Sequence, residues 1–331
     1  MRVTWNGKRV LVTGAGGFIG SHLVEGLVGL GADVTAFIHY NSNGHRGWLD
    51  RVSKEVQSEI CFYAGDLKDQ DAVRGAVRNQ EIVMHLGALI AIPYSYQNPT
   101  DVFQTNVLGT LHVAQAVREY GISRMVHTST SEVYGSAQIV PISESHPLQG
   151  QSPYSASKIG ADKCVESFYC SFDLPVVTVR PFNAYGPRQS MRAVIPTIIN
   201  QALHRDEIVL GNLDATRDFT YVQDTARAFI HAATSEQAIG TTVNAGSGKE
   251  IRIEELAIYI QQIIGRELPI RVADERLRPP KSEVDRLCSD SSKALRVMGW
   301  APQISLREGL EKTVEWICSN PEGYRPDQYV V

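Results

Sequence analysis

The sequence predicts a doubly wound α/β protein, in which helices cover both faces of a parallel sheet and a smaller second domain follows. Three observations favour this fold. Short apolar segments alternate with segments of helical periodicity through the first half of the chain. The expected strands are apolar at almost every position, as strands buried on both faces are. After Arg180-Pro181 this alternation gives way to short apolar stretches broken by Pro, Gly and Asn, so we expect domains at residues 1–181 and 182–331.

Each element of the first domain has a local reason. The first helix should follow Gly14, because Ile19, Leu23 and Leu27 recur at one-turn spacing, and Gly31 should end it. Five apolar segments predict strands, at residues 9–13, 33–38, 59–63, 81–86 and 124–128. Further helices are expected at about 69–77 and 99–120 and, in the second domain, at about 252–265 and 305–318.

The composition is that of an ordinary globular protein and excludes several classes of partner. The 331 residues carry a formal charge of −4, which favours neither nucleic acid nor an anionic membrane. The five cysteines are odd in number and lack CxxC spacing, so we expect reduced thiols and no metal site. Residues 1–8 leave no room for a signal peptide, and no apolar run approaches the roughly 20 residues of a membrane span. We expect a cytoplasmic protein.

The turn after the first strand carries a glycine pattern that is typical of phosphate binding. Gly14, Gly17 and Gly20 form GxxGxxG between the expected strand and helix. Glycine permits the tight turn and lets the backbone approach a pyrophosphate, which the free N–H groups at the start of the helix then bind. This arrangement predicts a dinucleotide cofactor.

The end of the second strand does not decide between NAD and NADP. An acidic residue at this place usually binds the adenosine ribose of NAD. Here the strand continues into His39-Tyr40-Asn41-Ser42, and Asp33 lies at its start, too early to reach the ribose. Without a carboxylate nothing repels the 2′-phosphate of NADP, and His39 or Arg46 could bind it. The predicted cofactor is therefore NAD or NADP.

Tyr154 and Lys158 are the candidate proton-transfer pair. They are four residues apart and share one face of a helix that Ser152-Pro153 is suited to begin. We expect the ammonium of Lys158 to lower the pKa of the Tyr154 phenol, which would make this phenol a usable base near neutral pH.

Further motifs occur in the order found in one enzyme family. Besides the glycine loop and YxxxK they are Gly65-Asp66-Leu67, His85-Leu86-Gly87-Ala88, the segment TNVLGT at 105–110 and the segment RPFNAYGP at 180–187. Over nearly its whole length the chain resembles the extended short-chain dehydrogenases, in particular the NAD-dependent epimerase/dehydratase family. The resemblance implies a Rossmann domain, a carboxyl-terminal domain for a nucleotide-diphosphate sugar, and a homodimer through helices at about 99–120 and 152–171.

The resemblance also implies which residues bind the two ligands. Those expected to contact the cofactor are Gly14, Gly17, Phe18, Ile19, Gly20, His39, Asp66, Leu67, Leu86, Ala88, Asn106, Thr128, Tyr154, Lys158 and Pro181. Those expected to contact the nucleotide sugar are Tyr94, Asn183, Arg188, Arg192, Arg217 and Arg278. Arginine suits the second group, because its guanidinium binds phosphate oxygens in a bidentate manner.

The segment Thr130-Ser131-Glu132 narrows the expected reaction. Thr130 matches the family hydroxyl that holds the sugar 4-hydroxyl beside Tyr154, and Glu132 resembles the base of the sugar-nucleotide 4,6-dehydratases. Ser131 stands where dTDP-glucose 4,6-dehydratases carry Asp; it matches GDP-mannose 4,6-dehydratases and also UDP-glucuronate decarboxylases. In a dehydratase Ser131 and Glu132 would be catalytic residues that supply a proton as water leaves C6. Segments around 40–50 and 186–196 are similar to the 4,6-dehydratases of the legionaminic-acid route, which act on a nucleotide-linked N-acetylglucosamine.

These resemblances favour a 4,6-dehydratase that recycles its NAD(P), and they leave other readings open. A UDP-glucuronate decarboxylase and a 4-epimerase begin with the same oxidation at C4 of the sugar. A catalytically inactive NAD(P)-binding scaffold is the alternative from another class, although intact Thr130, Tyr154 and Lys158 argue against it. The nucleotide base is also open among UDP, GDP and CDP.

Overall fold

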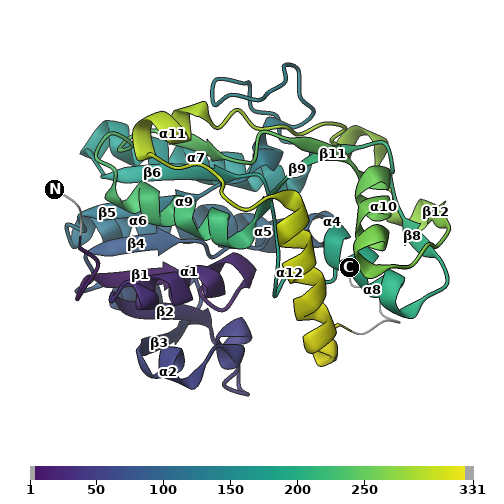
Figure 1. The fold of residues 1–331 in the computed structure, drawn as a ribbon. Coiled ribbons are helices and arrows are strands. Elements are labelled where there is room, and N and C mark those ends of the chain that lie inside the picture. Colours follow the sequence, from purple (N-terminus) through teal and green to yellow (C-terminus); the bar gives the residue numbers. More distant parts are fainter. Residues whose placement is uncertain (1–3, 325–331) are drawn as a thin grey trace.

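A parallel sheet of seven strands organises the molecule (Figure 1). The structure, a computed structural model, describes residues 4–324. The strand order is β10-β6-β5-β4-β1-β2-β3, and every neighbouring pair is parallel. The strands are β1 (Arg9–Thr13), β2 (Asp33–His39), β3 (Ile60–Gly65), β4 (Ile82–His85), β5 (Arg124–Thr128), β6 (Val176–Pro181) and β10 (Thr242–Ala245).

Helices cover both faces of this sheet, which confirms the predicted doubly wound α/β fold. The strands alternate between the two faces: Val10 and Val12 of β1 belong to one apolar core, and Leu11 belongs to the other. The first core is closed by α1 (Phe18–Gly29), α9 (Val222–Thr234) and α11 (Ser292–Met298), and the second by α3 (Gln70–Val77), α6 (Gly109–Glu119) and α7 (Pro153–Phe172). Within the described part of the chain, no helix has the length and apolar character needed to cross a membrane.

The predicted strands and helices agree with the structure except for one segment. The helix expected at about 99–120 is continuous but not uniform: α5 (Pro99–Phe103) and α6 are joined by η2 (Gln104–Leu108), a π-helical turn. The wider turn holds Asn106, whose side chain bonds the backbone of Leu89 on both its N–H and its C=O. Such π-turns often occur at functional sites.

The second half of the chain builds a smaller layer beyond the carboxyl ends of the large sheet. Its strands form a three-stranded sheet in the order β11-β9-β7 and a two-stranded sheet, β12-β8. The bounds are β7 (Asn183–Tyr185), β8 (Ile208–Leu210), β9 (Thr216–Tyr221), β11 (Glu250–Arg252) and β12 (Ile270–Val272). Three helices pack on a core of their own: α8 (Val194–His204), α10 (Ile253–Ile264) and α12 (Leu306–Ser319). Shorter elements are η1 (Gly47–Arg51), α2 (Lys54–Ser58), α4 (Ile92–Gln97), η3 (Ser131–Tyr134), η4 (Asp274–Arg276), η5 (Pro280–Ser282) and η6 (Pro321–Gly323).

Parts of residues 182–331 return to the large sheet. β10 pairs with β6 along Thr242–Ala245, α9 packs against α1, and Ala294 and Met298 of α11 join the same core. The division at residue 181 stays a prediction of domain organisation. The packing adds that a unit built on the large sheet would include α9, β10 and α11, so the chain crosses between the two layers more than once.

Candidate active site

The glycine loop between β1 and α1 has the geometry of a phosphate cradle. Gly14 has φ +67°, and a Cβ on it would lie 2.8 Å from Gly87, so no other residue fits there without strain. A Cβ on Gly17 would lie 3.1 Å from the carbonyl oxygen of Gly14. Gly17 also caps α1 without any side-chain hydrogen bond. The first N–H groups of α1 are therefore available to an anion.

The loop that follows β2 packs directly on the glycine loop. The N–H of Trp48 donates to the carbonyl of Gly16 at 2.9 Å. Nearby, the guanidinium of Arg46 lies 4.0 Å from the centroid of the Phe62 ring, and His39 Nε2 lies 3.7 Å from Asp66 Oδ2. The end of β2 is thus lined by an imidazole and a guanidinium where NAD-binding sheets usually place a carboxylate.

Three further residues predicted to contact the cofactor, Leu67, Asn106 and Thr128, lie near the carboxyl ends of the neighbouring strands. Leu67 fills the space beside Gly87, where a Cβ would lie 2.7 Å from its Cδ1 atom. Asn106 links the segment after β4 to α7, because its Nδ2 donates to Leu89 O and to Ser157 Oγ, each at 2.9 Å. The buried hydroxyl of Thr128 has no hydrogen-bond partner among residues 4–324. A free buried hydroxyl at the carboxyl end of β5, on the same edge of the sheet as the glycine loop, fits a polar cofactor, so the chain suits the dinucleotide that its sequence predicts.

Tyr154 and Lys158 lie at the start of α7, which a capping box of Ser152 and Ser155 begins. Lys158 Nζ donates to Thr128 O at 2.6 Å, and burial lowers the pKa of this ammonium to about 8. Burial raises the pKa of the Tyr154 phenol, and its hydrogen bond with the Thr130 hydroxyl lowers it. The expectation of a lowered pKa for Tyr154 is therefore wrong for the chain alone, because the cost of burying the phenolate outweighs the hydrogen bond with Thr130.

Glu132 lies on the turn η3, which follows β5, and its side chain is close to Tyr154. Thr130 caps the turn η3, with its Oγ1 accepting from the N–H of Glu132 at 3.2 Å, and Ser131 is buried. The Glu132 side chain is 14% exposed, and its charge raises the pKa of Tyr154. The structure therefore brings Thr130, Glu132 and Tyr154 together at the carboxyl end of β5, where open α/β sheets bind their ligands.

A cavity of about 340 Å³ opens beside this group. Four of the six residues predicted to bind substrate line it: Asn183, Arg192, Arg217 and Arg278. Arg217 is nearly buried and lies 3.3 Å from Glu283, and Arg278 lies 3.6 Å from Glu132. Burial lowers the pKa of Arg217, the charge of Glu132 raises it, and that of Arg278 lowers it. The arginine cluster and the acid of η3 thus form one electrostatic unit.

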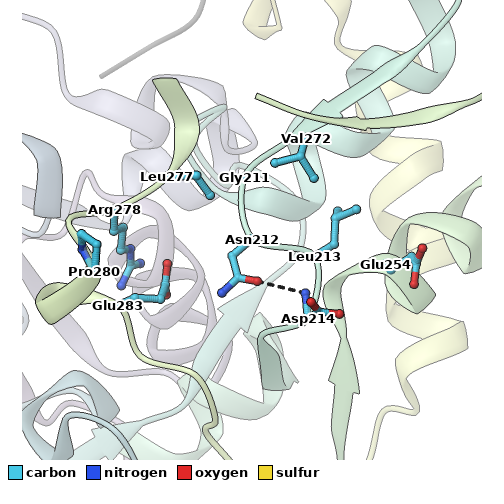
Figure 2. Close-up of a pocket in the computed structure, with 10 residues that line it drawn as sticks. All are labelled: Gly211, Asn212, Leu213, Asp214, Glu254, Val272, Leu277, Arg278, Pro280 and Glu283. Carbon is cyan, nitrogen blue, oxygen red and sulfur yellow. Dashed lines mark hydrogen bonds between the residues drawn. The ribbon is translucent and has the colours of Figure 1, made fainter. Parts of the chain in front are cut away.

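A second cavity, of about 440 Å³, adjoins the first (Figure 2). The two share Gly211, Asn212, Arg278 and Glu283 in their walls. In Figure 2 Arg278 and Glu283 lie on one side and Asn212 faces them, with its Oδ1 accepting from the N–H of Asp214 at 3.0 Å. Asn212 and Glu283 were not expected from the sequence. The only signal is Gly211-Asn212 after a strand, which indicates a turn but no ligand.

Two predicted substrate residues lie elsewhere. Arg188 turns toward α1, where its Nη1 donates to Glu25 at 2.5 Å and to Ser21 Oγ at 3.2 Å. Tyr94 donates its hydroxyl hydrogen to Asp101 at 2.9 Å. Neither residue lines the two cavities. Arg188 is almost buried, so its guanidinium needs a carboxylate close at hand, and Glu25 supplies it.

The phosphate loop at the first strand and the tyrosine–lysine pair beside the fifth define the chain as a nucleotide-sugar enzyme of the short-chain dehydrogenase type, in the NAD-dependent epimerase and dehydratase class. Within this class the chain belongs to the GDP-mannose 4,6 dehydratase family, whose sequence profile matches residues 11–313.

Similar proteins differ in their reactions. The chain is 32% identical to a putative UDP-glucose 4-epimerase of Methanocaldococcus jannaschii, over 94% of this chain and 99% of that protein. It is 33% identical to a UDP-N-acetyl-alpha-D-glucosaminuronate decarboxylase of Bacillus cytotoxicus, over 93% and 97%. The solved structure of the dTDP-glucose 4,6-dehydratase DesIV of Streptomyces venezuelae, with NAD bound, matches with a TM-score of 0.88 at 30% identity, over 96% and 99%. The reaction of this chain has to be argued from its own residues.

Proposed function

We propose that this protein is a nucleotide-sugar 4,6-dehydratase, which converts a nucleotide-diphosphate hexose to the 4-keto-6-deoxy sugar. The observation that carries the proposal is the position of Glu132. Its carboxylate stands on η3 between Tyr154 and the arginine-lined cavity, largely shielded from water. A 4-epimerase has no step that needs a second base beside the tyrosine, whereas a dehydratase has to remove the proton on C5.

The residues divide the chemistry as follows. Tyr154 takes the proton of the sugar 4-hydroxyl, held by Thr130, while Lys158 supplies a positive charge beside the phenolate. The bound nicotinamide cofactor supplies an acceptor, and later a donor, of hydride. The 4-ketone acidifies the hydrogen on C5, so Glu132 can remove it. That proton leaves with the C6 hydroxyl as water, which creates a C5–C6 double bond conjugated to the ketone. C6 then gains the hydride and C5 gains the proton that Tyr154 took, so the sugar loses one water in total and the cofactor would end in its starting oxidation state.

The substrate is placed by the second layer. Arg217 and Arg278 suit the diphosphate, Asn183 suits the sugar, and the adjoining cavity with Asn212 suits the nucleoside. N-acetylglucosamine is the first sugar to test, because of the resemblance to the legionaminic-acid dehydratases.

One assay tests the proposal. The enzyme is incubated with NAD and, separately, with UDP- and GDP-N-acetylglucosamine, UDP-glucuronate and UDP-glucose, and products are followed by mass and by NMR. Loss of one water supports dehydration, and the Glu132→Gln variant should lose this product. Full activity of that variant, or an unchanged mass with altered sugar couplings, contradicts the proposal; the second result indicates an epimerase.

UDP-glucuronate is included because of Arg192. A decarboxylase needs a cation near the C6 carboxylate, and Arg192 lines the substrate cavity with its Nε bonded to Ser190 Oγ at 3.3 Å. The 33% identity to a decarboxylase gives this second candidate further support. Loss of carbon dioxide from UDP-glucuronate, with no product from the other sugars, would favour it over the dehydratase.

The assembly we propose is a homodimer through α5–η2–α6 and α7. Large apolar side chains lie exposed on these helices: Phe103, Leu108 and Phe172. Arg118 of α6 packs 3.8 Å over the Phe172 ring, so the two helices already form one surface. A second copy of the chain would cover it, as the resemblance to the epimerase/dehydratase family implies.

A further inference from the structure

A buried polar network lies beneath the catalytic pair. Asp162 is on α7, one turn beyond Lys158, so Tyr154, Lys158 and Asp162 share one buried face. Asp162 Oδ2 accepts from Ser129 Oγ at 2.8 Å and from Arg180 Nη2 at 2.9 Å. Its Oδ1 faces His127 Nε2 at 3.2 Å. The carboxylate is 5% exposed and therefore needs all of these partners.

The network also reaches the turn that carries Glu132. Arg180 Nη1 donates to the Tyr134 hydroxyl at 3.0 Å, and this hydroxyl donates to Asn244 Oδ1 at 2.7 Å. Tyr134 is the last residue of η3, two residues after Glu132. Asp162 and Arg180 thus connect α7, β5, β6 and β10 under both proposed proton-transfer groups.

The charges in the network are uneven. Lys158 and Arg180 are cations, and among residues 4–324 Asp162 is the one carboxylate that forms an ion pair with Arg180. Burial lowers the pKa values of His85 on β4 and His127 on β5, so both are neutral near pH 7. Charged groups further out are Glu132, which acts on Tyr154, and Glu144 and Lys293, which lie near Tyr134 and Arg180. Burial alone would raise the pKa of Asp162, but the hydrogen bond of His127 and the charge of Arg180 lower it to about 2. Asp162 therefore stays ionised.

This fixed negative charge opposes the cost of burying the ammonium next to it. Burial lowers the pKa of Lys158, and the charge of Asp162 raises it. Without that charge the pKa of Lys158 would be lower still, because burial disfavours the charged form of a lysine. Arg180 acts in the opposite sense, because it neutralises part of the charge of Asp162.

We propose that Asp162 is a positioning residue for the reaction, the buried counterion that keeps Lys158 protonated beneath Tyr154, and that Arg180 sets how strongly it does so. The inference rests on the proposed function only in taking Tyr154 and Lys158 as the proton-transfer pair. It assigns no contact between Asp162 and the substrate.

The test is the pH profile of the purified, NAD-loaded enzyme with the nucleotide sugar that it dehydrates. Asp162→Asn keeps the size of the side chain and removes one negative charge, so both limbs of the profile should move to lower pH by about one unit or more. Arg180→Gln removes one positive charge and should move them to higher pH. The double variant should return toward the wild-type profile. Glu311→Gln, which removes a charge from the exposed pair with Arg307 on α12, is the control and should cause no shift.

The opposite directions of the pH shifts in Asp162→Asn and Arg180→Gln distinguish this role from a merely structural one. If Asp162→Asn and Arg180→Gln lower the rate by the same factor at every pH, the network only supports the fold and the inference is wrong. A readout that needs no sugar keeps the test independent of the proposed function. In the NAD complex, the titration of the Lys158 ammonium, followed by carbon-13 NMR of the lysine Cε atoms and assigned with Lys158→Met, should move to lower pH in Asp162→Asn and to higher pH in Arg180→Gln. Unshifted titrations would overturn the inference even if dehydration is observed.

Discussion

Arg278 Nη1 lies 3.6 Å from Glu132 Oε2, so the residue proposed for the substrate diphosphate is paired with the residue proposed as the base. This Nη1 atom is buried and makes no hydrogen bond within residues 4–324. Since Nη1 is held to Glu132 by charge alone, the guanidinium can turn this atom to a better partner. A diphosphate in the cavity would be such a partner, and Glu132 would then lose its counterion when substrate is bound.

Glu132→Gln should therefore strengthen the binding of UDP, a ligand that undergoes no reaction. The variant removes the competing anion, and a partly exposed ion pair of this kind contributes about 0.2–1 kcal/mol, so the affinity should rise about 1.4- to fivefold. Isothermal titration calorimetry measures this. In the Arg278→Gln background the same change should bring a smaller gain. An equal gain in both backgrounds would show general repulsion by Glu132 and no competition for Arg278.

In the NAD complex, where the cationic nicotinamide lowers the pKa of the Tyr154 phenol, the rate of the reaction should fall as pH rises through about 8. Burial lowers the pKa of Lys158 to this value, and the ammonium has to be charged to support the phenolate of Tyr154. The free energy of unfolding should depend on pH in the opposite direction and rise as pH rises. Since the folded pKa lies below that of the unfolded chain, the buried ammonium costs stability at neutral pH, and this cost is relieved as pH rises from about 8 toward the unfolded value. Rates and thermal melting between pH 6 and 10 check both trends; a rate that keeps rising above pH 9 contradicts the assignment.

Cofactor preference should depend on the end of β2. His39→Asp places a carboxylate where it can accept hydrogen bonds from the adenosine ribose and repel a 2′-phosphate. We expect the ratio of NADP to NAD dissociation constants to rise by about tenfold, or ~1.4 kcal/mol. Fluorescence titration with both cofactors measures the ratio. Arg46→Ala is the companion variant: it should weaken NADP more than NAD if the guanidinium binds the phosphate, and equal effects would remove it from this role.

Leu108→Glu should convert the proposed dimer to monomers. The leucine is exposed on η2 within the helix surface proposed as the interface, and a carboxylate there would be buried without a partner by a second copy. Sedimentation velocity at several concentrations measures the change. Leu295→Glu, on the exposed side of α11, is the control and should leave the mass unchanged. A wild-type protein that sediments as a monomer would contradict the proposed assembly.

The large sheet was predictable because its first five strands are apolar runs separated by turn residues, which report local structure. β10 was not, because Thr242–Ala245 is a short edge strand whose place beside β6 depends on packing far along the chain. The π-turn at Asn106 was not predictable either, because the side chain of Asn106 bonds to Leu89 and Ser157, which are distant in the sequence. Motifs singled out Tyr154, Lys158 and Glu132 because each belongs to one contiguous segment, and their catalytic roles stay predictions. The sequence shows that an arginine is charged but not where its side chain points. Arg188 and Arg217 were therefore predicted alike, and only the structure shows that Arg188 is paired with Glu25.

Arg188→Ala should therefore lower stability without weakening substrate binding. Arg188 is 11% exposed and its removal leaves Glu25 partly buried without its cation, which should cost about 1–3 kcal/mol of unfolding free energy. The Arg188→Ala variant should bind UDP as tightly as the wild type does. The Arg217→Ala variant, changed in the cavity wall, should bind UDP at least about tenfold more weakly. Urea unfolding and calorimetry give the two quantities. The stability loss should be largely recovered in Glu25→Gln/Arg188→Met, where no charge is left unpaired. A loss of UDP affinity in Arg188→Ala comparable to that of Arg217→Ala would return Arg188 to the substrate site.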